Sequence, residues 1–295
     1  MISKNFYEYS SAADPVMIDI PIQVFDLDLI GDKSGWIPFD LSAKLTLPYA
    51  ATGPSLLAGY IHVEPNTSAR VVPHASAVFC CVVRGTGRVV LDTEAFELGQ
   101  YDVLSLPGNG SIDVFADDEP LTLYSVNDSP LLHRLRVKPA CRAFAPLQYK
   151  AEDIFSMLRD IDSDPDAANR NRDALIYGHP DVTIGKGMSP TVWGATVQVN
   201  PGEDAMPHKH NSIAIDIALD CEEGAFSRLG WKLNDKNEII DPIEVPWKTG
   251  SAFVTPPGIW HSHHNTGTKR ALVTAVQDAT LHEYLQTLDI QFTYK

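Results

Sequence analysis

Hydrophobic positions along the chain fall in short runs that favour strands over helices. The runs are rich in Val, Ile, Leu and Tyr, and they end at Gly, Pro, Asn or Asp. Runs of this length and composition are typical of β-strands that bury one or both faces. We expect strands in both halves of the chain, at Leu57–Glu64, Ala77–Val83, Arg88–Leu91, Val103–Leu106, Ile112–Phe115, Leu121–Val126, Val192–Val199, Ile213–Leu219, Ser251–Thr255 and Ala271–Val276.

One helix is predicted between the two groups of strands. Ala151–Ile161 has apolar residues at helical spacing, and Glu152 and Asp153 lie in its first turn, where acidic residues favour a helix start. Asp162–Arg172 is polar and contains an Asp-Pro step, so we expect a linker or exposed loop there. The chain therefore divides into a β-domain over residues 1–150, and a helix, linker and second β-domain over residues 151–295.

The two halves have the features of a degenerate internal repeat. Val63-Glu64-Pro65-Asn66 matches Val199-Asn200-Pro201-Gly202, and Gly99…Pro107-Gly108 parallels Gly250…Pro256-Pro257-Gly258. His74 then falls near the position that His210 has in the second half. The repeat predicts two β-domains with the same fold.

Two histidine clusters in the second half carry the candidate chemistry. In the extended segment His208-Lys209-His210, both imidazoles share one face because strand side chains alternate. The turn at Pro256-Pro257-Gly258 can bring His261 in from a neighbouring strand. Three neutral imidazoles suit Fe, Zn, Cu or Ni, and they leave coordination positions for substrate and for oxygen or water. The sequence therefore predicts a metal site made by His208, His210 and His261.

Composition narrows the choice of partners. The chain has 295 residues, 44% of them hydrophobic, and a formal net charge of -15. This acidic excess argues against nucleic acid or an anionic membrane as partner, since both need a basic surface. The first residues carry no apolar leader, and no apolar run is long enough to cross a bilayer. The four cysteines lack metal-site spacing and are expected to be free thiols. We expect a cytoplasmic protein that acts on a small molecule.

The second half resembles a cupin. Five residues match every fixed position of that family's second motif, G-x5-P-x-G-x2-H-x3-N: Gly250, Pro256, Gly258, His261 and Asn265. Gly202, His208 and His210 match the first motif, but its glutamate position holds Ala214 or Ile215. The resemblance implies an all-β protein of two cupin (double-stranded β-helix, jelly-roll) barrels with a short connecting helix.

Within that superfamily, the chain resembles the gentisate dioxygenase-like bicupins. They have an H-x-H pair without the glutamate, then an apolar strand and a W-H-x-H segment. Here these are His208–His210, Ala214–Leu219 and Trp260–His263. Specific motifs extend over most of Val192–Phe292, whereas Leu57–Val137 is similar only in its pattern of strands. The resemblance implies Fe(II) held by three histidines.

Two departures from those relatives are informative. Their iron usually lies in the N-terminal cupin, but here Val72 stands two residues before His74, and Ser111 or Ile112 occupies the third ligand position. We therefore expect a degenerate first barrel without metal. Asp216 stands where the relatives often have an arginine that meets a substrate carboxylate. It would repel such a substrate unless another cation compensates, and three candidates are Arg228, Lys232 and Lys248.

Further residues are assigned by their position relative to the metal ligands. If His261 lies on a strand, His263 shares its face as an acid or base near the metal, and His264 faces away. Asp216 and Gln277 are candidate hydrogen-bonding groups at the reaction site. The residues expected to bind substrate are Trp260, Asp216, Trp231 and Asn265. Simpler alternatives remain, with His263 as an exposed loop histidine and Asp216 as a strand residue paired with a lysine.

Three functions fit this pattern. The first is a non-haem Fe(II) dioxygenase that uses O2 to cleave a C–C bond in an aromatic substrate, similar to gentisate or salicylate, or in an enolisable one. The second is a non-redox isomerase, lyase or hydrolase with Zn, Mn or Ni as Lewis acid. The third is a cupin that binds a ligand without turnover. Exposed sheet edges predict a homo-oligomer, a dimer or a tetramer.

Overall fold

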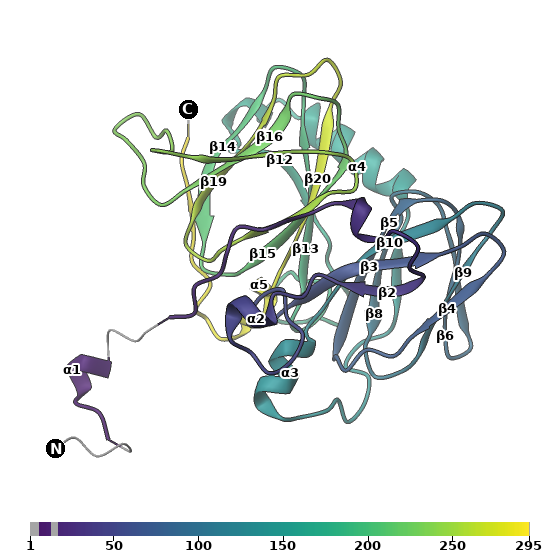
Figure 1. Ribbon diagram of the computed structural model, residues 1–295. Coiled ribbons are helices and arrows are strands. Elements are labelled where there is room, and N and C mark those ends of the chain that lie inside the picture. Colours follow the sequence, from purple (N-terminus) through teal and green to yellow (C-terminus); the bar gives the residue numbers. More distant parts are fainter. Residues whose placement is uncertain (1–5, 13–16, 295) are drawn as a thin grey trace.

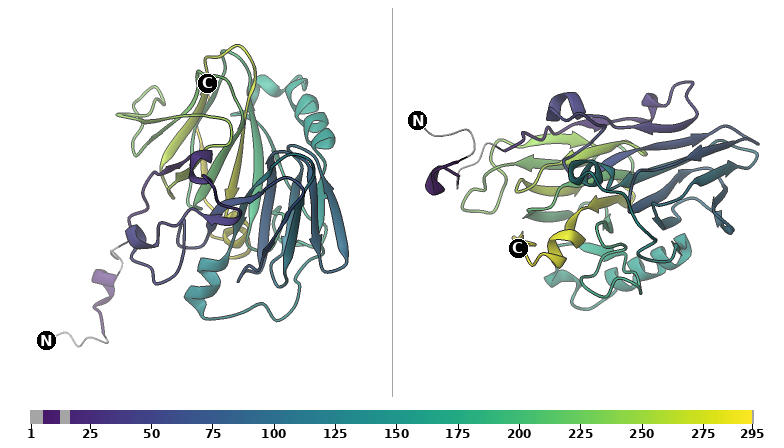
Figure 2. Two further views of the ribbon diagram at one scale, coloured as in Figure 1. Left: turned by 45° about the vertical axis from the view of Figure 1, so that its right-hand side comes forward. Right: turned by 90° about the horizontal axis from the view of Figure 1, so that it is seen from below.

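The computed structural model describes residues 6–12 and 17–294, which form two β-barrels side by side (Figures 1 and 2). The first barrel consists of a sheet in the order β11 (Leu147–Tyr149), β8 (Val103–Pro107), β5 (Ala77–Arg84), β10 (Leu121–Asn127), β3 (Leu57–Val63) and β2 (Gly35–Pro38), and a sheet in the order β4 (Ser68–Val71), β9 (Ile112–Ala116), β6 (Gly87–Leu91) and β7 (Glu94–Leu98).

The second barrel repeats this arrangement. Its larger sheet has the order β1 (Val24–Phe25), β18 (Ala252–Thr255), β15 (Ala214–Asp220), β20 (Ala271–Gln277), β13 (Trp193–Val199) and β12 (Asp173–Ile176). Its smaller sheet has the order β17 (Ile243–Pro246), β16 (Ala225–Gly230), β19 (Trp260–Asn265), β14 (Asp204–His210) and β21 (Ile290–Phe292). The predicted all-β fold of two cupin barrels is confirmed.

The predicted connecting helix is present as α4 (Ala151–Asp162). It buries Ile154 and Leu158 and packs along β12. The remaining helical segments are short: α1 (Tyr9–Ala12), η1 (Leu27–Leu29), α2 (Ser42–Leu45), α3 (Ser129–Leu135), η2 (Ala167–Asn169) and α5 (Ala279–Tyr284). Within residues 6–12 and 17–294, no helix combines the length and apolarity that crossing a bilayer requires.

The two barrels pack through their larger sheets. Tyr60 and Tyr124 of the first barrel lie in one apolar cluster with Ile215 and Ile217 of the second. The Tyr124 hydroxyl donates to the backbone oxygen of Ile215 over 2.9 Å, so this buried phenol has the hydrogen bond that it needs. Side chains alternate along each strand, and the opposite face of each larger sheet is therefore left for the interior of its own barrel.

The interiors of the barrels differ. The first is filled by a cluster of buried apolar side chains that includes Val89, Leu104 and Ile112. His74 is bonded through Nε2 to the Val137 oxygen and stacks on His133, with 4.4 Å between the ring centroids. In the second barrel, apolar residues fill only part of the interior. The pocket that remains is lined in part by four histidines, His208, His210, His261 and His263.

The short strand β1, near the N-terminus, also contributes to the second barrel. β1 pairs with β18 in the register Val24↔Phe253. The division at residue 150 did not anticipate this pairing, because the two-residue strand has no repeating pattern of its own. The N-terminal segment thus covers an edge of the larger sheet that would otherwise expose unpaired backbone groups.

Candidate metal centre

Three imidazoles converge from two neighbouring strands of the second barrel. His208 and His210 lie on one face of β14, and His208 stands opposite His261 of β19 in the strand register. The ring centroids of His208 and His261 are 3.9 Å apart, and those of His210 and His261 are 4.9 Å apart. One nitrogen from each of the three residues lies within 4.8 Å of the others. The predicted ligand set is therefore gathered in one place.

The turn before β19 brings the third histidine into place. Gly258 has a φ of +79°, which a residue with a Cβ adopts only with strain. Its N–H donates to the backbone oxygen of His210 over 2.7 Å. The turn is thereby tied to the end of β14, and His261 follows three residues later. This explains physically why a glycine is needed at this position of the motif.

The hydrogen bonds of His210 and His261 leave one nitrogen lone pair on each ring for a metal. His210 Nδ1 lies 2.8 Å from the Ser212 oxygen, and His261 Nδ1 lies 3.1 Å from the Ile259 oxygen. A carbonyl only accepts, so each Nδ1 carries the proton and each Nε2 a lone pair. The Nε2 atom of His210 is buried, and no described residue hydrogen-bonds to it. A buried lone pair of this kind is expected at a ligand position.

Burial also keeps the imidazoles in the form that binds metals. Desolvation lowers the pKa of His210 to about 4 and the pKa values of His208 and His261 well below 6.5. All three rings are therefore neutral at pH 7, and neutral imidazole is the ligand form. The donor set fits a first-row transition metal.

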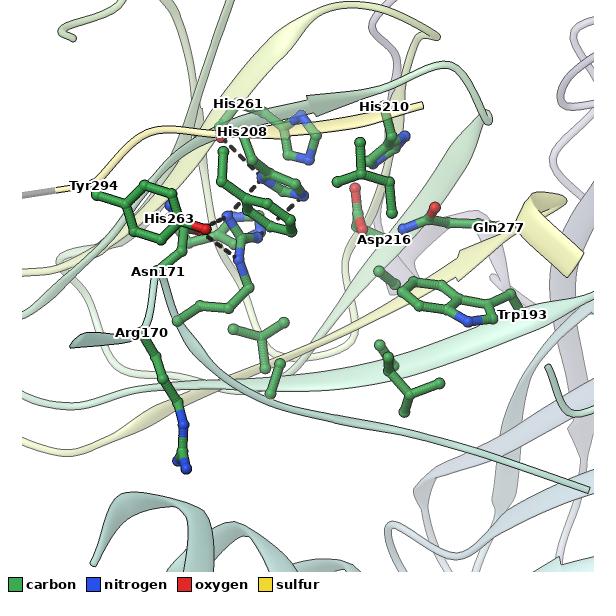
Figure 3. A pocket seen from close by; sticks show the side chains of 18 of the residues that line it. Arg170, Asn171, Trp193, His208, His210, Asp216, His261, His263, Gln277 and Tyr294 are labelled. Atoms are coloured by element: carbon green, nitrogen blue, oxygen red, sulfur yellow. Dashed lines mark hydrogen bonds between the residues drawn. The ribbon is translucent and has the colours of Figure 1, made fainter. Parts of the chain in front are cut away.

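The three histidines lie at one side of a pocket of about 420 Å³ (Figure 3). This volume falls in the range of small-molecule sites. Apolar side chains supply much of its wall: Ala174, Ile176, Trp193, Ala195, Val197, Ala275, Ile290 and Phe292. The polar part of the wall includes Arg172 from the linker, Asp216 and Gln277 from the larger sheet, and His263 from β19.

Two arginines line this pocket: Arg170 pairs with Asp164, whereas Arg172 lies beside the histidines. Its guanidinium approaches both ring nitrogens of His208, with 2.6 Å to Nδ1 and 3.2 Å to Nε2, and it donates to the Met206 oxygen over 3.0 Å. Burial lowers the pKa of Arg172 to about 9, so the group stays charged at pH 7. Its Nε and one Nη also donate to Asn171 Oδ1, over 2.9 and 2.5 Å.

The sequence did not reveal this arginine. Residues 162–172 were expected to form a linker or exposed loop, yet their last four line the pocket. None of the three cations considered instead lines it: Arg228 pairs with Glu244 over 2.9 Å, and Lys232 and Lys248 are exposed. The position of Arg172 depends on the pairing of β12 with β13, which no local pattern in the linker indicates.

Asp216 and Gln277 present an acceptor and a donor from the larger sheet. They lie on the neighbouring strands β15 and β20, and Figure 3 shows them close together. Thr255 Oγ1 donates to Asp216 Oδ2 over 2.5 Å, and Ser212 Oγ donates to Gln277 Oε1 over 2.7 Å. No described residue hydrogen-bonds to Asp216 Oδ1 or Gln277 Nε2. Burial raises the pKa of Asp216 to about 7. Its hydrogen-bond partner is Thr255, not a lysine.

His263 is a buried residue of the pocket, not an exposed loop histidine. It shares the inward face of β19 with His261, whereas His264 faces outward and pairs with Asp204 over 2.5 Å. His263 Nδ1 lies 2.8 Å from Ser227 Oγ, which also accepts the indole N–H of Trp247 over 2.9 Å. Among the described residues, His263 is the acceptor available for the Ser227 proton. His263 therefore carries its own proton on Nε2.

The other predicted substrate-binding residues lie outside the pocket lining. Trp260 packs on the outside under the Lys209 ammonium, 4.8 Å from the ring centroid. Trp231 is 63% exposed. Asn265 donates to the backbone oxygens of Val199 and Lys269, each over 2.8 Å. The structure thus places Asn265 in a turn-stabilising role, and the aromatic wall comes from Trp193 and Phe292.

Comparison with solved structures identifies the architecture. A salicylate 1,2-dioxygenase from Pseudaminobacter salicylatoxidans superposes with a TM-score of 0.72 over 92% of this chain and 88% of that one, at 15% identity. Its adduct with gentisate gives a TM-score of 0.76 over 97% and 89%, also at 15% identity. The chain has the bicupin fold. A structure of oxalate decarboxylase is similar to this bicupin with a TM-score of 0.57, at 12% identity over 90% of this chain and 78% of that one.

This chain has two curated relatives that are named as dioxygenases. It is 26% identical over 147 residues to a 5-nitrosalicylic acid 1,2-dioxygenase from a Bradyrhizobium species, in a match that covers 48% of this chain and 64% of the relative. It is 27% identical over 108 residues to a gentisate 1,2-dioxygenase from a Haloferax species, covering 37% and 26%. The matches therefore span less than two thirds of either relative. No protein-family model matches this chain.

Proposed function

We propose that the bicupin is an Fe(II)-dependent dioxygenase that opens the ring of a hydroxylated benzoate. The observation that carries the proposal is the set of three neutral histidines, with the free Nε2 of His210, in a pocket that also holds Arg172. The sequence relationship to enzymes named for 5-nitrosalicylate and gentisate supports the substrate class.

The metal would be held by His208, His210 and His261. A bound Fe(II) would supply a redox-active Lewis acid with positions open for substrate and O2. The protein contributes no carboxylate among these three ligands. The charge on the ion therefore stays available to attract an anionic substrate.

Arg172 orients the substrate in this proposal. A guanidinium binds a carboxylate through two parallel N–H groups, and this one stands beside the ring of His208. A benzoate bound in this way would have its carboxylate beside the metal site and its ring against the apolar wall. The positive charge of Arg172 also lowers the pKa of the buried Asp216 carboxyl group and so offsets its negative charge. With this compensating cation, the negative charge of Asp216 does not exclude an anionic substrate.

His263, Asp216 and Gln277 complete the polar surroundings of the substrate. His263 offers an N–H from Nε2, so it can donate a hydrogen bond to an oxygen of the substrate or of the opened ring. Asp216 Oδ1 and Gln277 Nε2 can accept from and donate to a ring substituent. A hydroxyl group satisfies both atoms at once, because it is donor and acceptor.

The proposal is tested by ring opening itself. The protein is loaded with Fe(II) under nitrogen and mixed with oxygenated gentisate, salicylate or 5-nitrosalicylate, and the loss of aromatic absorbance is followed with product mass. We expect one of these substrates to be consumed by the Fe(II) form and none by the Zn(II) form. Turnover of a substrate without oxygen would favour the non-redox alternative, and binding without turnover would favour the ligand-binding one.

Asp216→Asn is expected to change substrate preference. Thr255 donates to one oxygen of Asp216, so the amide oxygen of Asn would keep this bond and turn its NH2 toward the pocket. The ring hydroxyl of gentisate would then lose the acceptor for its proton, whereas a nitro group only accepts and loses nothing. A polar group left without its partner costs about 1–3 kcal/mol, so the ratio of kcat/KM for gentisate to kcat/KM for 5-nitrosalicylate should fall about tenfold.

The matched control for this substitution is Asp204→Asn, which changes a carboxylate that pairs with His264 on the outside. Its ratio should equal that of the wild type. An unchanged ratio in Asp216→Asn would show that Asp216 does not contact the ring substituent.

Four broader expectations remain predictions. The metal-free state of the first barrel, the choice of iron, the cytoplasmic location and the dimeric or tetrameric state all rest on the sequence. Light scattering on the purified protein measures the last of these directly.

A further inference from the structure

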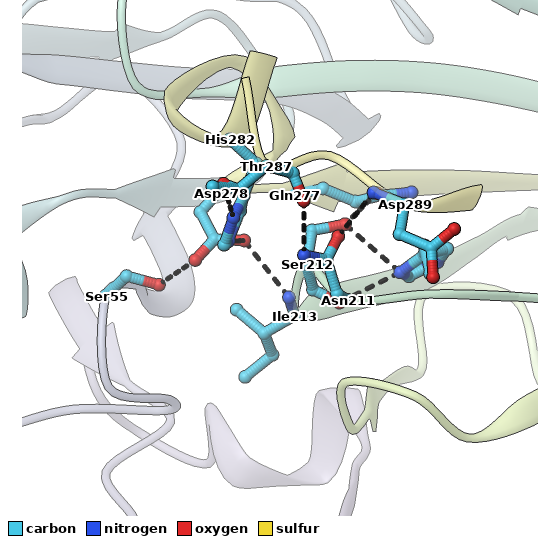
Figure 4. Close-up of polar contacts among 10 residues, drawn as sticks. Ser55, Asn211, Ser212, Ile213, Gln277, Asp278, His282, Thr287 and Asp289 are labelled. Carbon is cyan, nitrogen blue, oxygen red and sulfur yellow. Dashed lines mark hydrogen bonds and ion pairs between the residues drawn. The ribbon is translucent and has the colours of Figure 1, made fainter. Parts of the chain in front are cut away.

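A turn of the first barrel reaches the segment that follows the H-x-H pair (Figure 4). The N–H groups of Thr52 and Gly53 both donate to the Leu56 oxygen, over 3.0 and 2.9 Å, so the turn is closed by its own hydrogen bonds. A Cβ at Gly53 would lie 2.1 Å from Cδ1 of Ile213. Glycine thus permits a close approach between this turn and the second barrel.

Ser55 of this turn binds a buried carboxyl group of the second barrel. Its Oγ donates to Asp278 Oδ2 over 2.6 Å, and Asp278 Oδ1 accepts from the backbone N–H of Ile213 over 3.0 Å. His282 Nε2 lies 3.7 Å from the same Oδ1. Asp278 is only 8% exposed. The carboxyl group therefore joins the first barrel to the backbone of the second.

Ser212, the residue before Ile213, continues this connection to the metal centre. Its carbonyl accepts from His210 Nδ1 over 2.8 Å, and its hydroxyl donates to Gln277 Oε1 over 2.7 Å. Gln277 in turn directly precedes Asp278 in the chain. A shift of the backbone at Ser212 would rotate the His210 ring, because the Nδ1 hydrogen bond sets its orientation.

We propose that Ser55 is a positioning residue for the metal ligand His210. Through Asp278, Ser55 fixes the segment whose carbonyl orients that ring. The first barrel, whose interior is filled with apolar side chains, thus supports the metal centre of the second. The inference requires a metal at the three histidines and is independent of the reaction proposed above.

Cobalt(II) is the probe for this inference, because its visible spectrum reports ligand geometry and its affinity can be measured against a chromogenic chelator. Ser55→Ala and Asp278→Ala are each expected to weaken Co(II) binding about five- to tenfold, somewhat below the range for groups that contact a ligand directly. The visible spectrum should change with them. Asp278→Asn should restore binding, since its amide can accept from Ile213 N–H and donate to Ser55 Oγ.

Ser105→Ala is the matched control. Ser105 also makes a buried hydrogen bond from the first barrel to the second half, to the Met188 oxygen over 2.6 Å, but Met188 has no hydrogen bond to the residues around His210. We expect its Co(II) affinity and spectrum to match the wild type. Unchanged binding in Ser55→Ala, or equal weakening in Ser105→Ala, would overturn the inference. A wild-type protein that binds no Co(II) would overturn the metal site as well.

Discussion

His210→Ala is expected to abolish metal binding at the site and ring opening with it. The substitution removes one of three imidazoles, and the remaining two cannot hold the ion with comparable affinity. Loss of a group that merely supports a ligand costs about 10–100-fold in affinity, so loss of the ligand itself should cost ~100-fold or more. Metal content after dialysis and the rate of substrate loss are the two measurements.

The fold should survive this change. His210 Nε2 makes no hydrogen bond with the described residues, and the strand pairing of β14 is made by backbone groups. His264→Ala is the control, because this histidine lies on the neighbouring strand β19 but faces outward against Asp204. Full metal content in His210→Ala would mean that the ion is held elsewhere.

Arg172→Ala should raise KM strongly for a benzoate substrate. A hydrogen-bonded charge pair contributes about 1.5–3 kcal/mol, which corresponds to roughly a 10–150-fold change in affinity. Arg172→Lys should recover part of the loss, because the ammonium keeps the charge but loses the two-pronged geometry. The KM is determined for salicylate, and metal content is measured in parallel because Arg172 also contacts His208.

Arg228→Ala is the matched control for Arg172. It removes an arginine that pairs with Glu244 outside the pocket, and its KM should be unchanged. If Arg172→Ala has a wild-type KM for salicylate with normal metal content, the carboxylate does not bind there, and the proposed orientation of the substrate is wrong.

The strands that position the site were predictable where they are strongly apolar. Runs such as those of β3, β5 and β20 are buried on both faces, so their composition alone marks them. β12 and β17 have no such signal, because they are short and partly exposed edge strands. Their pairing comes from the closure of the barrel, which depends on residues far apart in the sequence.

The three candidate ligands and Arg172 show the same contrast. The three histidines follow from side-chain alternation and a glycine turn, both of which are local. Arg172 reaches the pocket because the linker turns back along β13, and its own neighbours in the sequence are polar. Trp260 could have been placed correctly, because it directly precedes His261 on a strand and must therefore face the opposite way.

The central claim is that three histidines hold a redox-active iron that consumes oxygen with a hydroxybenzoate. The direct measurement is oxygen uptake by protein loaded with Fe(II) under nitrogen, with metal per chain and substrate opened determined on the same sample. We predict about one iron per chain and one O2 consumed per ring opened. A protein that holds only zinc, or that holds iron and takes up no oxygen with any hydroxybenzoate tested, would contradict the claim.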